Sequence, residues 1–187
     1  MICVGTPQLI DAAGADLTYV HAAVDALIPY LAEDAVVLGR STVPVGTAAS
    51  LRERLRAAGR ENALAWNPEF LREGFAVEDT LRPDRIVYGL PEDPAESARA
   101  RAVLDEMYGT MLENGTPLVA GNYATAELVK VSANSFLATK ISFINAVAEI
   151  CEATGADVSV VAEAIGLDDR IGPKFLRAGI GFGGGGC

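Results

Sequence analysis

Two carboxylates four residues apart, Glu69 and Glu73, are the side chains of this sequence best spaced for acid–base chemistry. They lie in the stretch PEFLREG, directly after a short apolar run. If this stretch is helical, both carboxylates share one face, so that one can act as a general base while the other orients a ligand. An ordinary solvated pair of glutamates has the same spacing, and the spacing alone leaves both interpretations open.

A lysine and an asparagine with the same spacing, Lys130 and Asn134, could both donate to one developing oxyanion. Residues four apart are neighbours on a helix surface, and this stretch is rich in good helix formers. Glu127 precedes the lysine by one turn. A surface salt bridge between Glu127 and Lys130 is therefore the alternative interpretation.

A thiol and a hydroxyl are further candidates. Cys187 follows a run of glycines, whose backbone N–H groups could surround a thiolate and lower its pKa, although a cysteine in this place can equally be incidental. Thr42 precedes Val-Pro, where its hydroxyl could donate to a phosphate, a cofactor or a water, or could simply belong to a turn. The single histidine, His21, is expected at the surface. We expect no metal site, because one histidine and scattered cysteines do not form a ligand cluster.

The elements that position these groups alternate between short apolar runs and longer stretches with helical periodicity. Such alternation predicts βαβ units, and so an α/β fold with a parallel sheet. The expected strands are residues 2–4, 35–38, 63–66, 85–88 and 117–119, and the expected helices are residues 16–32, 47–58 and 95–111.

Polar turns follow the first three expected strands, at residues 5–7, 41–44 and 67–69. Ligands of open parallel sheets bind at the carboxyl ends of the strands. The three turns are therefore expected to meet at one edge of the sheet and to form a site there.

A long stretch without proline or internal glycine, residues 123–155, predicts a single helix roughly 45 Å long. This is longer than a small domain is wide, so we expect an element outside its own domain to pack on it. A shorter helix is expected at residues 157–165, and residues 172–178 are expected to add a turn or two.

The composition narrows the classes of partner. With 50% hydrophobic residues the chain can bury a core. A net charge of −10, from 15 basic and 25 acidic residues without a basic cluster, argues against nucleic acid. No apolar run could span a membrane and no signal peptide is present. Three widely separated cysteines fit a reducing compartment, so we expect a cytoplasmic protein.

The motifs together resemble one known family. The chain contains, in order, CVGTP, RSTVPVGT, NPEFLREG, RPDRIVYG, ANSFLATKISFINA and GLDDRIGPKFLRAGIGFGG. This succession resembles the UDP-glucose 6-dehydrogenase family of nucleotide-sugar dehydrogenases over nearly the whole chain. Dehydrogenases of GDP-mannose and UDP-N-acetylmannosamine share the plan, but the motifs here are closer to the UDP-glucose branch.

The resemblance implies an NAD-dependent enzyme with a partial Rossmann-like parallel sheet, a long central helix and a small helical segment. It would oxidise the C6 alcohol of UDP-glucose to the carboxylate of UDP-glucuronate, using two NAD⁺ per turnover. In that family a cysteine captures the aldehyde as a thiohemiacetal. A second oxidation then gives a thioester, which water hydrolyses.

The resemblance also implies a role for each matching residue. Glu69 would be the general base for hydrolysis, and Lys130 and Asn134 would stabilise the oxyanion. Thr42 would help to position water and cofactor, and Cys187 would be the nucleophile. The residues beside the nicotinamide would be Gly5, Thr6, Pro7, Thr42 and Glu73. The residues that hold the nucleotide sugar would be Glu69, Phe70, Leu71, Arg72, Lys130, Asn134, Phe175 and the segment from Gly181, with Arg170 reaching across a dimer interface.

The resemblance assigns residues 1–120 to the C-terminal half of an NAD-binding domain and residues 121–187 to a connecting helix and central helical domain. In that family the long helix forms the core of a homodimer, which would supply the outside partner that its length requires. No glycine-rich fingerprint follows the first strand, and the UDP-binding domain is absent. We therefore expect an internal piece of a longer enzyme, inactive by itself; a non-catalytic dimerising fragment is the alternative.

One departure from the family concerns the nucleophile. The family has Gly-Phe-Gly-Gly-Ser-Cys, whereas this sequence has GFGGGGC and places Gly186 where the cysteine is expected. Either one glycine is inserted and Cys187 acts as the nucleophile, or the nucleophile is replaced and Cys187 is incidental. A shift of one residue moves a side chain by about 3.8 Å along the chain, enough to change the geometry of attack.

Overall fold

The computed structural model describes residues 1–10 and 14–180. The chain divides into two compact units, the first extending to Val131 and the second starting at Ser132. The first unit is an α/β domain, and the second is helical.

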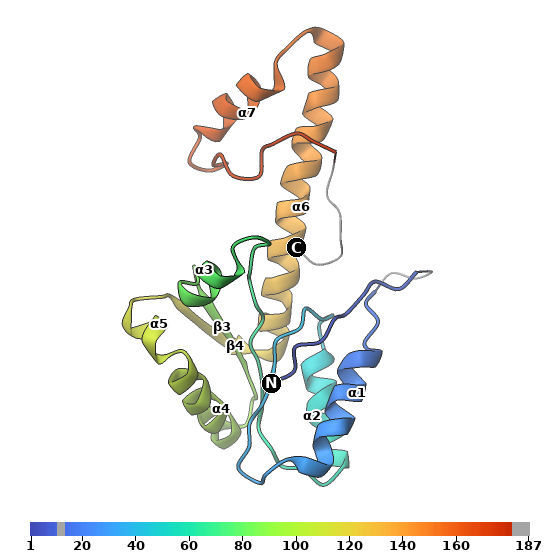
Figure 1. Cartoon of the computed structure of the whole chain (residues 1–187), viewed down its shortest axis with the longest axis vertical. Coiled ribbons are helices and arrows are strands. Elements are labelled where there is room, and N and C mark those ends of the chain that lie inside the picture. Colours follow the sequence, from blue (N-terminus) through green and yellow to red (C-terminus); the bar gives the residue numbers. More distant parts are fainter. Residues whose placement is uncertain (11–13, 181–187) are drawn as a thin grey trace. The chain divides into compact units, whose positions relative to one another are not determined.

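A four-stranded sheet forms the centre of the first unit (Figure 1). Its strands lie in the order β1-β2-β3-β4. They are β1 (Val37–Gly39), β2 (Leu64–Trp66), β3 (Ile86–Leu90) and β4 (Leu118–Asn122). β1 pairs with β2 in parallel, and β3 pairs with β4 in parallel. The predicted α/β class with a mostly parallel sheet is therefore confirmed.

The central pair differs from the expected parallel arrangement, because β2 and β3 are antiparallel, with Trp66 opposite Gly89. A parallel connection requires the chain to cross back over the sheet, usually as a packed helix. The segment between these strands contains only the six-residue helix α3 (Ala76–Leu81), which has no buried residue. The chain therefore re-enters the sheet at the edge where it left.

The first expected strand, residues 2–4, is reduced to a single bridge beside β1. Ile2 lies opposite Gly39 in parallel. The N–H of Ile2 donates to the carbonyl of Leu38 at 2.7 Å, and the carbonyl of Ile2 accepts from the N–H of Arg40 at 3.0 Å. This bridge extends the sheet by one short segment on the β1 side.

Helices cover both faces of the sheet (Figure 1). Side chains of β1 to β3 alternate between two cores, as a period of two residues requires. Burial on both faces explains why these strands are continuous apolar runs in the sequence. The helices of the first core are α1 (Thr18–Leu27), its 3₁₀ extension η1 (Ile28–Tyr30), α2 (Thr47–Ala57) and the start of α6 (Tyr123–Thr154). Those of the second core are α4 (Pro94–Met107) and α5 (Gly109–Glu113).

Two expected helices are interrupted. The helix expected at residues 16–32 ends as an α-helix at Leu27, because Pro29 lacks an N–H and crowds the preceding turn. The helix expected at residues 95–111 breaks at Tyr108, directly before a glycine, which is a poor helix former. The N-cap position of α1 is Leu17, and the carboxylate of the preceding Asp16 accepts the Thr18 N–H at 2.9 Å.

The long helix α6 (Tyr123–Thr154) is continuous over 32 residues, as predicted. It ends before Gly155, whose φ of 76° lies in the left-handed region that favours glycine at helix ends. α7 (Val158–Gly166) follows and starts at Asp157, whose carboxylate accepts the Ser159 N–H at 2.7 Å. In the part of the chain that the structure describes, no helix is both long and apolar enough to cross a membrane.

Within the second unit, α6 holds the segment that follows α7. The Lys140 ammonium donates to the carbonyl of Ile171 at 2.9 Å, and the Gly179 N–H donates to the Asn145 side chain at 2.9 Å. Residues 172–178 contain a turn at 174–175, and Phe175 there has a φ of 65°, which is uncommon for a residue with a side chain.

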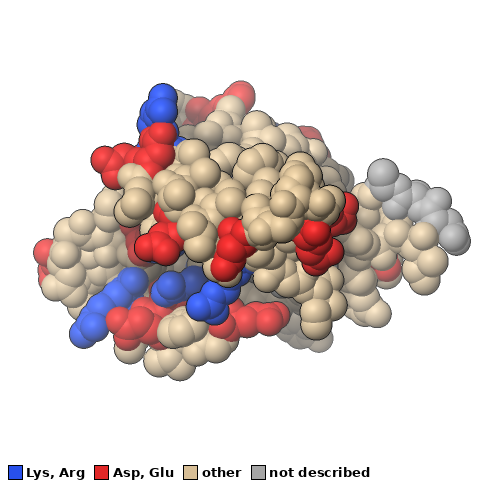
Figure 2. All heavy atoms as spheres, turned by 90° about the horizontal axis from the view of Figure 1, so that it is seen from above, with Lys and Arg blue, Asp and Glu red and all other residues tan. Residues whose placement is uncertain are grey.

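Basic and acidic side chains are mixed on the surface. Figure 2 shows acidic side chains spread over the face in view, with the basic ones lying beside them. Arg54 pairs with Asp25 at 2.5 Å, and Arg72 pairs with Asp79 at 2.5 Å. Each of these two arginines therefore lies beside a carboxylate that balances its charge.

The packing at Gly39 generates a first prediction. A Cβ atom at Gly39 would lie 2.0 Å from the ring of Trp66, which is fully buried. We expect Gly39→Ala to lower the free energy of unfolding by about 2–3 kcal/mol, measured by urea denaturation, because the Trp66 ring must move. At Gly109 a Cβ atom would meet nothing within 4 Å, so Gly109→Ala is the control and should change this free energy by less than about 1 kcal/mol. Equal losses in the two variants would contradict the explanation.

Candidate active site

The turns that follow the first two expected strands are joined by side-chain hydrogen bonds. The Ser41 hydroxyl accepts the Val4 N–H at 3.0 Å and donates to the Val4 carbonyl at 2.7 Å. The Thr6 hydroxyl donates to the carbonyl of Thr42 at 2.6 Å. Two of the three polar turns therefore lie together, as expected from strands that end at the same edge.

The third turn joins the same edge through Asn67. Its N–H donates to the carbonyl of Gly39 at 2.8 Å, and its side-chain oxygen accepts from the Arg40 guanidinium at 2.6 Å. The hydroxyl of Tyr108 also donates to this oxygen and accepts from Arg40. Burial raises the pKa of Tyr108, and the neighbouring Arg40 opposes this rise only in part.

The long helix α6 starts at the opposite edge of the sheet and runs toward the edge where the three polar turns lie. At its start the Tyr123 hydroxyl donates to the carbonyl of Leu64, the first residue of β2, at 2.7 Å. Seven residues of helix rise about 10 Å, which is close to the length of a three-residue strand. Lys130 therefore arrives beside the carboxyl end of β2, and its Nζ lies 3.1 Å from Oε1 of Glu69.

The Lys130–Glu69 pair combines a buried cation with a partly exposed carboxylate. The Lys130 side chain is 3% exposed and that of Glu69 is 30% exposed. The second carboxylate oxygen of Glu69 accepts the Leu71 N–H at 2.6 Å, and the Lys130 ammonium lies 5.3 Å from the centre of the Phe70 ring. A buried ammonium can stabilise a developing negative charge, and a held, accessible carboxylate can accept a proton from water.

The interpretation of Glu69 and Glu73 as a pair on one helix face is wrong. The stretch 67–72 is not helical, because the Leu71 N–H is bonded to the Glu69 side chain and the Arg72 N–H to the Asp79 side chain at 2.7 Å. Such side-chain bonds compete with helical ones. Glu73 lies exposed in the next turn. Of the two glutamates, only Glu73 is therefore an ordinary solvated side chain, as the alternative interpretation proposed.

The interpretation of Glu127 and Lys130 as a surface salt bridge is also wrong. The Glu127 side chain is buried, and its two oxygens accept the N–H groups of Gly46 and Ala48 at 2.7 Å each. Burial raises the pKa of Glu127, and the two backbone hydrogen bonds oppose that rise. The glutamate therefore binds the start of α2, and Lys130 pairs with Glu69.

The antiparallel direction of β3 adds a residue that sequence reasoning missed. In a parallel sheet Arg85, which precedes β3, would lie at the far edge. In the structure its guanidinium lies 3.9 Å from the centre of the Phe70 ring. Arg40 and Tyr108 were missed as well, and Glu127 was given the wrong partner, because no local sequence signal identifies the partners of these residues.

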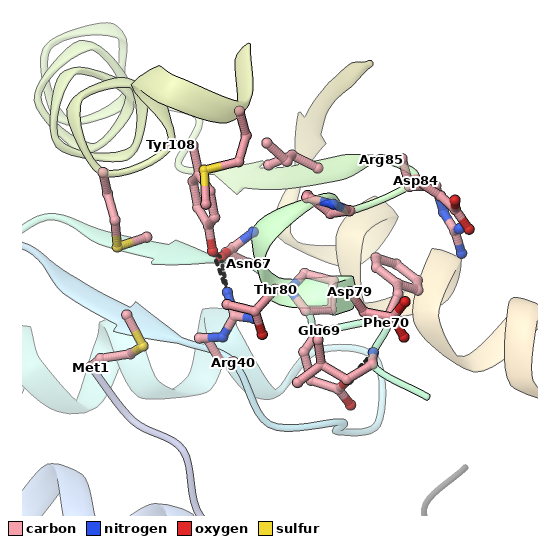
Figure 3. Close-up of a pocket in the computed structure, with 16 residues that line it drawn as sticks. Met1, Arg40, Asn67, Glu69, Phe70, Asp79, Thr80, Asp84, Arg85 and Tyr108 are labelled. Carbon is pink, nitrogen blue, oxygen red and sulfur yellow. Dashed lines mark hydrogen bonds between the residues drawn. The ribbon is translucent and has the colours of Figure 1, made fainter. Parts of the chain in front are cut away.

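A pocket of about 430 Å³ opens at this edge (Figure 3). Figure 3 shows Arg40, Asn67 and Tyr108 converging on one side of it, and Glu69, Phe70 and Asp79 on another. Three methionines supply an apolar part of its lining, and these are Met1, Met107 and Met111. The pocket thus combines apolar walls with two arginines, Arg40 and Arg85, which suits a ligand with an apolar ring and an anionic group.

The remaining site residues predicted from the sequence are distributed over both units. Gly5 and Pro7 are exposed in the first turn, and Arg72 is held by Asp79. Asn134 follows Lys130 by one turn of α6.

In the second unit Arg170 pairs with Asp168 at 2.6 Å, and Phe175 lines a separate pocket of about 440 Å³. Gly181 and Cys187 lie outside the described residues. The structure therefore brings Glu69, Phe70, Leu71 and Lys130 together, and it describes Arg170 and Phe175 within the second unit.

The Lys130–Glu69 ion pair generates a second prediction. Glu69→Gln leaves the Lys130 ammonium buried without its counter-charge, and we expect a loss of about 1–3 kcal/mol in the free energy of unfolding. Adding Lys130→Met should recover part of this loss, which a double-mutant cycle in urea measures. The exposed Glu73→Gln is the control and should stay within about 0.5 kcal/mol. Strictly additive losses for the two pair members would show that they are not coupled.

The chain matches known proteins in sequence and structure. Residues 1–112 match the NAD-binding domain, and residues 124–187 the central domain, of the UDP-glucose/GDP-mannose dehydrogenase family. UDP-glucose 6-dehydrogenase of Rhizobium meliloti is 47% identical over 98% of this chain and 42% of its own length. The chain thus spans about two fifths of the length of such a relative.

Two solved structures show the same arrangement of elements. A UDP-glucose dehydrogenase from Pyrobaculum islandicum superposes with a TM-score of 0.86 at 42% identity, over 97% of this chain and 41% of that one. A GDP-mannose dehydrogenase from Pseudomonas aeruginosa superposes with a TM-score of 0.80 at 28% identity, over 97% of this chain and 42% of that one. Since both of its domains match over nearly the whole chain, the protein belongs to the UDP-glucose/GDP-mannose dehydrogenase family.

Proposed function

We propose that this chain is the core of an NAD-dependent enzyme that oxidises the C6 alcohol of UDP-glucose to the carboxylate of UDP-glucuronate. The observation that carries the proposal is the buried Lys130 ammonium, 3.1 Å from the Glu69 carboxylate at the edge where three polar turns meet. Acyl chemistry requires a cation at the developing oxyanion and a base for water, and this pair supplies both.

The overall reaction converts one alcohol, two NAD⁺ and one water into a carboxylate, two NADH and three protons. When bound, NAD accepts the hydride in each of the two oxidations. Lys130, together with Asn134 one turn later, would hold the charge that develops on the C6 oxygen. Glu69 would take the proton from the water that hydrolyses the thioester, because its carboxylate is fixed by Lys130 and Leu71 and is still accessible.

We place the nicotinamide end of NAD along the first two turns, beside Gly5, Thr6, Pro7, Thr42 and Glu73. A Cβ atom at Gly5 would meet no atom within 4 Å, which leaves room for a flat ring close to the backbone. Thr6 fixes the first turn to the second. These residues fit the cofactor, and they support residues 1–120 as part of an NAD-binding domain.

UDP-glucose is preferred over GDP-mannose or UDP-N-acetylmannosamine because the relatives that share 43–47% of this sequence are named UDP-glucose 6-dehydrogenases. Glu69, Phe70, Leu71 and Arg72 would hold the sugar side, and Arg170, Phe175 and Gly181 would contribute from residues 121–187. Cys187 is the proposed nucleophile. Because the glycine run places it one residue later than in the family motif, its role should be tested directly.

The long helix offers a surface for a homodimer. Phe136, Phe143 and Ile150 are spaced by seven residues and are 66%, 54% and 62% exposed. Seven residues are close to two turns, so these side chains form one apolar stripe along α6. We propose that a second copy covers this stripe in a cytoplasmic homodimer; a dimerising, non-catalytic fragment is the alternative for the chain by itself.

Measurement of NADH formation tests the enzymatic proposal. The longest reading frame that contains this chain should form two NADH per UDP-glucose, and the 187 residues alone should form none. Lys130→Met should lower kcat by about 100-fold or more, as loss of an oxyanion donor does. Arg82→Met, at an 81% exposed side chain, is the control and should leave kcat unchanged. Turnover of GDP-mannose in place of UDP-glucose would change the substrate assignment, and no turnover of any nucleotide sugar would refute the function.

Sedimentation equilibrium tests the dimer. Phe143→Glu places a charge in the apolar stripe and should raise the Kd of the dimer by at least about tenfold. Leu167→Glu introduces the same charge at an 80% exposed position directly after α7 and should leave the dimer intact. Dissociation by both variants, or by neither, would contradict the proposed interface.

A further inference from the structure

The start of α2 is held by a residue from far along the chain. Its N-cap residue, Gly46, has no side chain to accept a hydrogen bond, and the Thr47 hydroxyl donates backwards to the Pro44 carbonyl at 2.7 Å. The first N–H groups of a helix need acceptors and carry partial positive charge. The two oxygens of Glu127 in α6 supply them, each at 2.7 Å, to Gly46 and Ala48.

The backbone at Gly46 is shaped for this contact. Its φ of 98° lies in the left-handed region, which a residue with a side chain adopts only with strain. This conformation turns the chain out of the segment 41–44 and into α2, with both N–H groups meeting one carboxylate. The Glu127 side chain is 1% exposed, so its hydrogen bonds are shielded from competing water.

The start of α6 carries three successive attachments to the rest of the first unit. Tyr123 bonds to the carbonyl of Leu64. The Cβ of Ala126 lies so close to Gly89 that a Cβ there would approach it to 2.7 Å. Glu127 adds a third attachment, through its hydrogen bonds to the N–H groups of Gly46 and Ala48. One turn later Lys130 meets Glu69.

We infer that Glu127 is a positioning residue: it sets the rotation of α6 so that the Lys130 ammonium meets Glu69, and it ties that pair to the turn that carries Thr42. Its effect on Lys130 follows from the contacts of the chain itself. Its effect on catalysis rests on the proposed function.

A residue that only stabilises α2 would give a different pattern from one that positions Lys130. Asp93 offers a matched comparison, because its carboxylate also accepts two backbone N–H groups at the start of a helix, Ala95 at 3.0 Å and Glu96 at 2.9 Å. Asp93 caps its own helix α4, so Asp93→Ala removes a cap of the same kind from another helix and leaves Glu127 in place. Glu127→Gln keeps the size of the side chain but points an amide N–H₂ at one of the two backbone donors.

The test measures the reactivity of Lys130 in the longest reading frame that contains this chain. Acetic anhydride acylates accessible amines, and peptide mass spectrometry gives the rate at Lys130. We expect Glu127→Gln to raise this rate at least tenfold and Asp93→Ala to leave it within twofold. If Lys130 stays protected in Glu127→Gln, or becomes reactive equally in both variants, the inference is overturned.

Kinetics supply a second and separable readout. With UDP-glucose and NAD⁺, Glu127→Gln should lower kcat by about 100-fold, the loss expected from a misplacement near 1 Å, with little change in KM. Asp93→Ala should keep the wild-type kcat. If the wild-type protein oxidises no nucleotide sugar, the proposed function fails, and the acylation rates still decide whether Glu127 positions Lys130.

Discussion

The burial of one ammonium group is the constraint on which the site depends. Moving a charge out of water is costly unless a counter-charge and good geometry compensate, and Lys130 is almost wholly buried. Glu69 supplies that charge from the turn after β2, and the Phe70 ring lies beside the ammonium. The pair is possible only because α6 starts at the opposite edge of the sheet and rises along β2 by the length of that strand.

One reversal of strand direction decides which other groups reach the same edge. Because β3 is antiparallel to β2, the residues that enter β3 lie beside the turn that leaves β2. Arg85 is thereby stacked on Phe70, and the pocket of Figure 3 acquires a second arginine. A fully parallel sheet with the same residues would have placed this cation at the far edge.

The helices of this chain are capped in two ways that have different consequences. Asp93 and Asp157 cap their own helices, and each acts locally. The N–H groups at the start of α2 instead donate to Glu127, about eighty residues later in the chain. This arrangement buries a carboxylate, and burial raises the pKa of Glu127. A long-range cap holds two elements together, and this one joins the segment that follows Thr42 to the helix that carries Lys130.

The sequence by itself determined the local elements and the family. The extent of α6 followed from good helix formers without glycine or proline, the strands from apolar runs, and the edge shared by three turns from their places after strands. The direction of β3, the partner of Glu127 and the non-helical stretch around Glu69 were decided by tertiary structure. Spacing along the chain favours neighbours within one turn, such as Glu127 and Lys130. Burial instead selects whichever donor or counter-charge the fold brings within reach, and that donor can lie anywhere in the sequence.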